Sequence, residues 1–383
     1  MKILFCSQVA ASRELGGSKV IVELAAAMTQ LGWQCDITSA PEIWRQLSPG
    51  GKLTPAQTLK MYLQEKAGSY DVVDYDHAFL PFDRNDFPKS TLMVARSVLL
   101  IHHMVEIKIP EPRTLYFRLK AFIHRRRDAK VLAARYRDAS RTCLEADLVN
   151  VSNDRDVEIL VRHGVKPERI VMVPHGIDAE RRILFDALSD VPPARPKVVF
   201  VGTFDHRKGC VGFSKITAAI AQAVPGVTFR LLGTAGLYQT ERQVRSFFPS
   251  EMQSRLEIIP HYGTRELPRL LSDCSVGIFP SFLEGFGFGI IEMLSAALPV
   301  IAYDAPGPSS ILPSEKRVPP GDTEAMAQKV IRLLNDPVLL QAERIAARKH
   351  SQQFNWPRVA NLTSEIYLKH LGRESVQGSL IHG

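Results

Sequence analysis

The apolar positions of the first half of the chain form two kinds of pattern. Short continuous runs predict buried strands, at 2–10, 35–40, 71–75, 90–104, 143–152 and 169–178. Between them, apolar residues recur every three or four positions and predict helices, among them 12–33, which Gly16 and Gly17 open, and 155–165. Strands that alternate with helices predict an α/β domain with a parallel sheet.

The same alternation starts again after a Pro-rich segment, "DALSDVPPARP", at 186–196. That segment is the best candidate for a domain linker. We therefore expect two doubly wound, Rossmann-like domains, 1–185 and 197–355. A last amphipathic helix at 356–373 is expected to return to the first domain, and 374–383 form a polar tail. Ligands of such sheets bind at the carboxyl ends of the strands, so the cleft between two domains is the natural site.

The composition fits this organisation. The length of 383 residues suits two domains, and 45% hydrophobic with 23% charged residues is typical of a globular protein. No apolar run is long enough for a membrane span. The N-terminus has some features of a weak signal peptide, but a first strand explains it better because a Gly-rich loop follows. The five scattered cysteines predict buried thiols in a reducing cytoplasm: Cys6, Cys35, Cys143, Cys210 and Cys274.

Positive charge gathers in one segment. The net charge is +8, and residues 113–141 hold ten Lys or Arg against two Asp. A solvated helix face is one explanation, and contact with a phospholipid surface, an acidic glycan or a nucleic acid is the other. Tyr116, Phe117, Phe122 and Ile123 lie among the charges, a mixture typical of a membrane-surface helix.

The stretch "FLEGFGFGIIEMLSAALPV" contains the densest candidate chemistry. Glu284 and Glu292 are separated by about 800° of helical rotation and cannot share one face, which predicts a loop that turns into a helix. Gly287, Phe288 and Gly289 would open that helix with bare N–H groups, which bind anions. The two carboxylates can accept hydrogen bonds from sugar hydroxyls. Together these features predict a site for a sugar linked to a pyrophosphate, although a Glu in the first helical turn, as expected for Glu292, also has a purely structural explanation.

Three further groups lie at predicted strand ends. Arg207 and Lys208 follow the first strand of the second domain and could meet a phosphate or simply form a charged turn. Gly16 and Gly17 offer another bare helix start, without the GxGxxG dinucleotide pattern. His102 and His103 end the 90–104 run and are either catalytic or structural.

These motifs resemble those of the retaining GT-B glycosyltransferases with an E-x(7)-E motif, the family-four group. The resemblance covers most of the chain and includes "GGSKVIVELAAAMTQLGW", "VMVPHGID", "VVFVGTFDHRKG" and "PSFLEGFGFGIIE" followed by "PVIA". It implies two Rossmann-like domains, a nucleotide-sugar donor, a glycan or glycolipid acceptor and no obligatory metal.

The resemblance also implies a role for each matching residue. Glu284 would contact the transferred sugar and Glu292 the ribose, while Lys208, with Arg207 beside it, would neutralise the leaving diphosphate. His102, with His103 as the alternative, would lie near the reacting carbon. It implies backbone contacts to the sugar and phosphate at Phe286, Gly287, Phe288 and Gly289, base contacts at Gly233, Pro260, His261 and Tyr262, and an acceptor-side glycine loop at Gly16 and Gly17. The family usually has Arg at the position of Thr203, so one of two expected phosphate cations is missing here, and either Arg207 compensates or the donor is held less tightly. It usually has Asn at the position of His175, where a structural role is expected.

Three other functions fit parts of the sequence. "DYD" at 74–76 matches the Asp-x-Asp signature of metal-dependent glycosyltransferases. Sugar-nucleotide epimerases share the two-domain fold, and a non-catalytic protein could use the basic segment to bind anionic lipid. No nucleic-acid module is visible. The sequence favours a cytoplasmic retaining transferase of surface polysaccharide, lipopolysaccharide or glycolipid synthesis, with peripheral membrane contact through 113–141.

Overall fold

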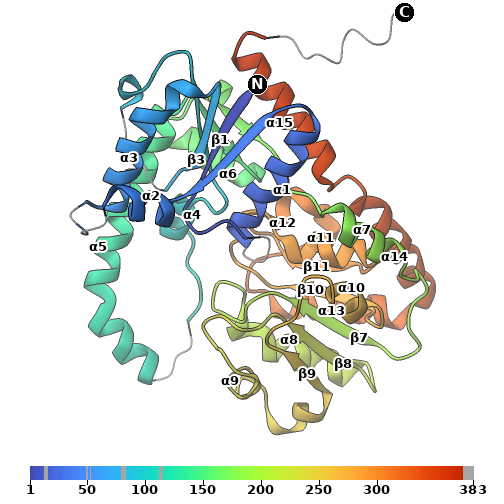
Figure 1. Cartoon of the computed structure of the whole chain (residues 1–383). Helices are drawn as coiled ribbons and strands as arrows, with labels where there is room; N and C mark the ends of the chain where they lie inside the picture. Colours follow the sequence, from blue (N-terminus) through green and yellow to red (C-terminus); the bar gives the residue numbers. More distant parts are fainter. Residues whose placement is uncertain (13–15, 49–50, 52, 79–82, 112–114, 374–383) are drawn as a thin grey trace, which may run out of the picture. The chain divides into compact units, whose positions relative to one another are not determined.

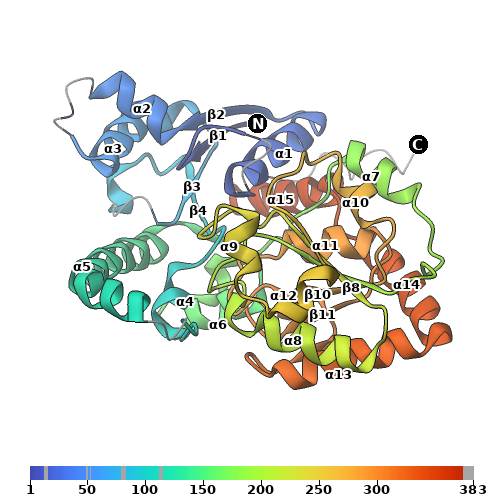
Figure 2. The same ribbon diagram turned by 90° about the horizontal axis from the view of Figure 1, so that it is seen from below.

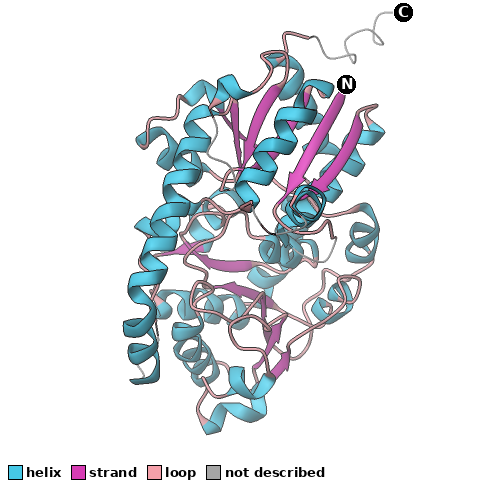
Figure 3. Ribbon diagram, turned by 60° about the vertical axis from the view of Figure 1, so that its left-hand side comes forward, coloured by secondary structure: helices cyan, strands magenta, loops and turns pink. Residues whose placement is uncertain are grey.

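The computed structural model describes residues 1–12, 16–48, 51, 53–78, 83–111 and 115–373, except for the side chains of 16, 55 and 115–127. It divides into two compact units. The first comprises 1–106, 124–176 and 355–383, and the second 107–123 and 177–354. Each unit contains one sheet with helices on both sides (Figures 1 and 3). No helix in the described parts of the chain is both long and apolar enough to cross a membrane.

The sheet of the first unit has six parallel strands in the order β2-β1-β3-β4-β5-β6. Its strands are β1 (Lys2–Ser7), β2 (Gln34–Ser39), β3 (Val72–Asp76), β4 (Leu92–Arg96), β5 (Leu148–Val151) and β6 (Ile170–Met172). Its helices are α1 (Gly16–Gln30), α2 (Ala40–Leu47), α3 (Pro55–Lys66), α4 (Ile101–Glu106), α5 (Leu115–Glu145, in this unit from residue 124), α6 (Asp154–Arg162) and α15 (Trp356–His370). Figure 2 shows α5 as a long helix in teal.

One predicted strand of this unit is wrong in extent. The apolar run 90–104 predicted a strand that reaches His102 and His103, but β4 ends at Arg96 and both histidines lie in α4. The chain turns after Arg96, so the apolar residues that follow belong to a loop and a short helix. A helix of six residues is too short to display a helical period, which is why the run looked continuous.

In this unit, helices α2 and α3 went unpredicted although their start signals are present. Thr54 caps α3 by accepting from the backbone N–H of Gln57, and the Gln57 side chain accepts from the backbone N–H of Thr54 in return. At α2, the backbone N–H of Ser39 donates to Glu42. Each start is Ser or Thr followed three residues later by Glu or Gln, the sequence of a capping box.

The C-terminal helix α15 is part of the first unit. Trp33 donates its indole N–H to Ser364 and lies edge-on to Tyr367, with ring centroids 6.4 Å apart. The Tyr367 hydroxyl donates to Asp74, at 2.7 Å. Residues more than 290 positions apart in sequence thus share one core.

The second unit repeats the architecture with its own strand order, β12-β11-β10-β7-β8-β9. Its strands are β7 (Lys197–Val201), β8 (Thr228–Leu232), β9 (Leu256–Ile259), β10 (Val276–Phe279), β11 (Val300–Tyr303) and β12 (Arg317–Val318). Its helices are α7 (Ala179–Asp186), α8 (Cys210–Ala223), α9 (Glu241–Arg245), α10 (Leu267–Leu271), α11 (Phe288–Ser295), α12 (Pro308–Ile311), α13 (Thr323–Asn335) and α14 (Pro337–Ser351).

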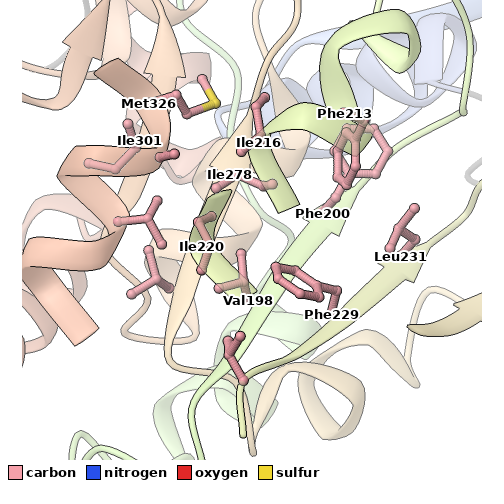
Figure 4. Close-up of a cluster of buried hydrophobic side chains, with 14 of the residues drawn as sticks. Val198, Phe200, Phe213, Ile216, Ile220, Phe229, Leu231, Ile278, Ile301 and Met326 are labelled. Atoms are coloured by element: carbon pink, nitrogen blue, oxygen red, sulfur yellow. The ribbon is translucent and has the colours of Figure 1, made fainter. Parts of the chain in front are cut away.

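Alternation along β7 builds a hydrophobic core on each face of this sheet. Val198 and Phe200 point to the face covered by α8 and α13, where they join Phe213, Ile216 and Met326 (Figure 4). Val199 and Val201 point to the opposite face, into a second cluster that includes residues of α11. Helices therefore fix the sheet from both sides, and the loops at its carboxyl end start from buried strands.

Candidate functional site

Two loops at the carboxyl end of the second sheet bring opposite charges together. Arg207 and Lys208 lie in the loop after β7, and Glu284 lies in the loop between β10 and α11. The Lys208 Nζ atom is 2.6 Å from Glu284 Oε1, and Arg207 Nη1 is 3.2 Å from the same oxygen. Arg207 also donates to the carbonyl of Leu283, at 2.8 Å. Two cations thus share one carboxylate, which leaves a net positive charge at this point.

Glu284 stays ionised in this environment. Burial alone would raise the pKa of its carboxyl, but the charges of Lys208 and Arg207 outweigh burial and hold the pKa below its ordinary value. The Lys208 backbone is fixed as well, because its N–H donates to Asp205, at 2.9 Å. The charge cluster is therefore held in place from both loops.

The glycines of these loops are required by close packing. Gly289 lies so near β7 that a Cβ atom would be 2.7 Å from the carbonyl oxygen of Val201. Gly209 has a φ of +82°, and a Cβ there would be 2.1 Å from the carbonyl oxygen of Pro280. Gly287, with a φ of +109°, precedes the first residue of α11, Phe288. These contacts explain the glycines by packing, independently of any ligand.

Glu292 lies deeper in α11 than expected. The helix starts at Phe288, so Glu292 is its fifth residue and not part of its first turn, and the cap explanation for it is wrong. Its Oε1 atom accepts from Arg181 Nη1, at 2.6 Å, and Arg181 Nε in turn donates to Asp178 Oδ2, also at 2.6 Å. Both carboxylates raise the pKa of the buried Arg181 guanidinium, although burial opposes them.

Arg181 is the principal residue that the sequence analysis missed. It is 2% exposed and lies 111 positions before Glu292. In sequence it is one of two adjacent arginines after a helix cap, a pattern typical of a solvated helix. No local signal reveals a pair formed across such a distance.

The structure brings together only some of the residues that were expected near the nucleobase of the donor. Gly233 has a φ of +71°, and a Cβ there would be 3.1 Å from the Tyr262 ring. Burial, and next the charge of Glu292, raise the pKa of the Tyr262 hydroxyl, so this ring lies within electrostatic reach of the second carboxylate. Pro260 is half-buried and His261 is exposed. Gly233, Tyr262 and Glu292 therefore form one continuous region.

Thr203 occupies the position where the resemblance led us to expect Arg. Its hydroxyl donates to Asp205 Oδ2, at 2.8 Å, and its Cβ would be 2.8 Å from a Cβ added at Gly236. Since Asp205 also accepts from the Lys208 backbone, Thr203 supports the loop that carries the two cations. The positive charge that Thr203 lacks is present nearby in Arg207.

In the first unit, neither predicted catalytic histidine lies at a strand end. His102 is fully buried and its Nε2 atom lies 3.0 Å from the Ser140 hydroxyl. Burial lowers its pKa to about 3, so the ring is neutral. His103 Nε2 lies 2.8 Å from Asp156 Oδ1. Both rings thus pair with residues of neighbouring helices, Ser140 of α5 and Asp156 of α6, and are buried.

A pocket of about 310 Å³ lies instead at the carboxyl ends of β1, β3 and β4. Gly17, at the start of α1, lines it together with Asp76 and His77. Asp74 lines it too, but Arg96 donates to both carboxylate oxygens of Asp74 and the Tyr367 hydroxyl donates to one of them. The carboxylate of Asp74 is thus already occupied, which weighs against the Asp-x-Asp metal hypothesis. No cluster of metal-ligating side chains occurs among the residues described.

His175, which replaces the usual Asn, has a structural position. It is buried, and its ring stacks on Trp356 with centroids 6.1 Å apart. Burial, aided by the charge of Arg96, lowers its pKa to about 3. The neighbouring Gly176 has no room for a side chain, since a Cβ would be 2.5 Å from the Trp356 nitrogen.

The expected membrane face of 113–141 can be followed only in part. The side chains of Tyr116, Phe117, Phe122 and Ile123 lie outside the described residues. Residues 128–131 are exposed, and from 132 to 138 half-buried and exposed positions alternate, with Arg135 and Arg137 exposed.

Comparison with protein families finds a match within the second unit. Residues 195–336 match the family described as Glycosyl transferases group 1. The matched segment lies within the second unit and covers less than half of the chain. The match includes Lys208, Glu284 and Glu292 and confirms the family resemblance for this domain.

Individual relatives of the group 1 domain extend the comparison. The chain is 26% identical over 239 residues to the D-inositol 3-phosphate glycosyltransferase of Saccharomonospora viridis, which covers 58% of this chain and 56% of that protein. The chain thus spans little more than half the length of this curated relative.

Solved structures match both units. Sucrose-phosphate synthase from Thermosynechococcus elongatus superposes with a TM-score of 0.71 at 20% identity and covers 97% of this chain and 99% of that one. Anabaena HepE, solved in complex with UDP and glucose, gives a TM-score of 0.64 at 16% identity and covers 95% and 98%. At these identities the likeness shows the fold, and it confirms the GT-B class expected from the sequence.

Proposed function

We propose that this protein is a retaining glycosyltransferase that moves a sugar from a nucleotide-sugar donor to a hydroxyl of a glycan or glycolipid. The observation that carries the proposal is the cluster of Arg207, Lys208 and Glu284 beside the start of α11, inside the group 1 domain. Two cations around one buried carboxylate match a diphosphate that leaves beside a sugar. A protein that only binds lipid has no need of this arrangement.

The geometry suggests how the donor is held. The diphosphate would lie against Lys208, Arg207 and the N–H groups at the start of α11, where its negative charge is stabilised. Glu284, held ionised, would accept from hydroxyls of the transferred sugar. Glu292 would accept from ribose hydroxyls through the oxygen that Arg181 does not bind, and Tyr262 and Gly233 would border the base.

Catalysis in this scheme comes from positioning and charge. The cations stabilise the leaving diphosphate as the bond to the sugar breaks, and the same-face arrival of the acceptor retains the anomeric configuration. Because Lys208 and Arg207 supply the positive charge, we propose that no metal is obligatory. UDP-sugars are the first donors to test, since the similar HepE was solved with UDP and glucose.

The acceptor side is proposed to be the first unit, with Gly16 and Gly17 in its glycine loop. The basic segment 113–141 would bring the protein to an anionic membrane on the cytoplasmic face, in line with synthesis of a surface polysaccharide, lipopolysaccharide or glycolipid. Retention by vesicles rich in anionic lipid at low salt, and release at high salt, is the expected result. Failure to bind at low salt would remove the lipid part and leave the transferase.

The direct test is release of nucleoside diphosphate. Wild-type protein is incubated with UDP-, GDP- and ADP-sugars, and the free diphosphate is measured over time. We expect release from one donor class, and loss of release in Lys208→Ala. A sugar-nucleotide epimerase of the same fold could convert the sugar, so NMR of the products separates transfer from isomerisation.

A further inference from the structure

The pocket of the first unit has an unusual polar floor. It is bounded by the ends of β1, β3 and β4 and by the start of α1, so it lies where ligands of parallel sheets bind. Its floor includes Asp76 and His77, and apolar residues, among them Val9 and Met104, lie at its edge. Val9 is 43% and Met104 36% exposed, which leaves apolar surface open beside the polar floor.

The hydrogen bonds of His77 define where its proton lies. The ring is 2% exposed, and its Nε2 atom accepts from the backbone N–H of Ile101, at 3.3 Å. Burial lowers the pKa of His77, although Asp76 and Asp156 act in the opposite direction, so the ring is neutral. A neutral ring that accepts at Nε2 carries its proton on Nδ1.

That Nδ1–H group is buried and donates to no group among the residues described. A buried donor without an acceptor is destabilising, so a position like this one favours a ligand or water that can accept. The Oδ1 atom of Asp76 is 3.5 Å from Nδ1, too far for a hydrogen bond, and already accepts from the backbone N–H of Ala78, at 2.8 Å.

Asp76 supplies an acceptor oxygen beside the His77 donor. None of the described groups donates to its second oxygen, and its side chain is 19% exposed toward the pocket that it lines. A donor on His77 and an acceptor on Asp76 therefore lie side by side. A hydroxyl group satisfies both, because its oxygen accepts from Nδ1–H while its hydrogen is donated to the carboxylate.

We infer that His77 and Asp76 bind one hydroxyl of a polyhydroxylated ring, a sugar or a cyclitol, that forms the head group of the acceptor, in a pocket that Arg135 also lines. This inference rests on the proposed function for the word acceptor, but the binding itself does not. The apolar edge suits such a ring, whose C–H face is apolar while its rim carries hydroxyls. Asp74 takes no part, because Arg96 and Tyr367 occupy it.

The test is NMR of the full-length protein labelled with ¹⁵N-histidine. Methyl α-D-glucopyranoside, maltose and myo-inositol are titrated in turn, and tetrahydropyran serves as a ring without hydroxyls. We expect the His77 Nδ1–H resonance to shift with at least one of the three hydroxylated rings and not with tetrahydropyran. No response of His77 to any of the three, or an equal response to tetrahydropyran, would overturn the inference.

Two variants sharpen the test. Asp76→Asn keeps the size of the side chain and the bond to Ala78 but replaces the free oxygen with a donor, so affinity for the responding ring should fall about tenfold. Asp36→Asn, in the same sheet but outside the pocket, should leave affinity unchanged; Asp36 instead pairs with Lys2 and Tyr70. Equal affinity of wild type and Asp76→Asn would exclude Asp76 from the site.

The NMR test of the head-group site and the diphosphate-release test of the transferase can fail independently of each other. Release of nucleoside diphosphate by wild-type protein without a His77 response would leave the transferase standing and remove the head-group site. A His77 response in a protein that releases no diphosphate from any donor would do the reverse: the ring-binding site would stand, and the transferase would fall.

Discussion

The two units have the same sheet architecture but opposite uses of charge at their ligand ends. In the second unit, charged groups of two loops pair with one another, as Lys208 does with Glu284, and Arg207 adds a second cation. In the first unit, the strongest pair, Asp74 with Arg96, is fully buried, and the pocket above it presents a neutral His77. The parallel sheet fixes where a ligand binds, whereas the side chains on its loops decide whether that ligand is an anion or a hydroxyl.

The glycines near the ligand ends of the two units also differ, in the space available for a side chain. In the second unit, side chains are excluded at Gly209 and Gly289 by the backbone of neighbouring strands and loops. In the first unit, nothing lies within 4 Å of a Cβ added at Gly17. Gly209 and Gly289 are thus needed for the fold itself, while Gly17 leaves space open beside its pocket.

The largest expected effect comes from breaking the buried pair of the second unit. Arg181→Met leaves Glu292 buried without its cation, which typically costs about 3–5 kcal/mol. We expect a lower melting temperature together with weaker donor binding. The control is Arg265→Met, which removes an exposed pair with Glu180 and should change stability little. Equal losses in both variants would show that burial of Arg181 is irrelevant.

The next effect concerns the rate of reaction. Lys208→Ala should lower kcat roughly 100- to 1,000-fold, since one preorganised donor to a developing charge contributes about that much. Kinetics of diphosphate release measure it. Lys215→Ala, an exposed lysine on α8, is the matched control and should match wild type. A Lys208→Ala enzyme with an altered KM alone would place Lys208 in binding and not in stabilising the leaving group.

A pair of glycine variants distinguishes backbone strain from steric contact of an added Cβ atom. Gly209 and Gly226 have similar φ values of +82° and +79°, but a Cβ at Gly226 meets nothing within 4 Å. In Gly226→Ala the free energy of unfolding should therefore fall only by the cost of a left-handed backbone at alanine, about 1–2 kcal/mol. In Gly209→Ala it should fall by about 1–3 kcal/mol more, because the added Cβ contacts Pro280. Chemical denaturation measures both, and equal losses would show that the loop yields to the added atom.

The smallest effect is a pH dependence specific to the first unit. The pKa of His175 is about 3 in the folded state against an ordinary 6.5, so its neutral form is favoured by folding. This stabilisation is complete above pH 6.5 and is lost as the pH falls toward 3, at about 1.4 kcal/mol per pH unit. His175→Phe should remove this slope between pH 6.5 and 5, measured by denaturation or by hydrogen exchange of the first unit. An unchanged slope would assign the acid sensitivity to other groups such as His102.

The sequence predicted most of the strands and the residue types of the candidate site. Periodicity located β1, β3 and β7, and the family resemblance assigned Glu284 and Lys208 to one site, but their ion pair was not predicted. The predictions failed where the local sequence pattern does not reveal a short helix or a contact between residues far apart in sequence. The strand expected to reach His102 ended early because a short helix has no visible period, and Arg181 was missed because its partner lies 111 residues away.

The position of α15 has a consequence for synthesis on the ribosome. Trp33 and Asp74 are made early, yet their partner Tyr367 emerges only after some 190 residues beyond the first unit's main segment, a delay of roughly 10–40 s at typical translation rates. Residues 177–354 emerge in that interval and can complete their own core. The domain that is translated first is therefore finished last, and a chaperone that binds nascent chains would meet its open face for most of translation.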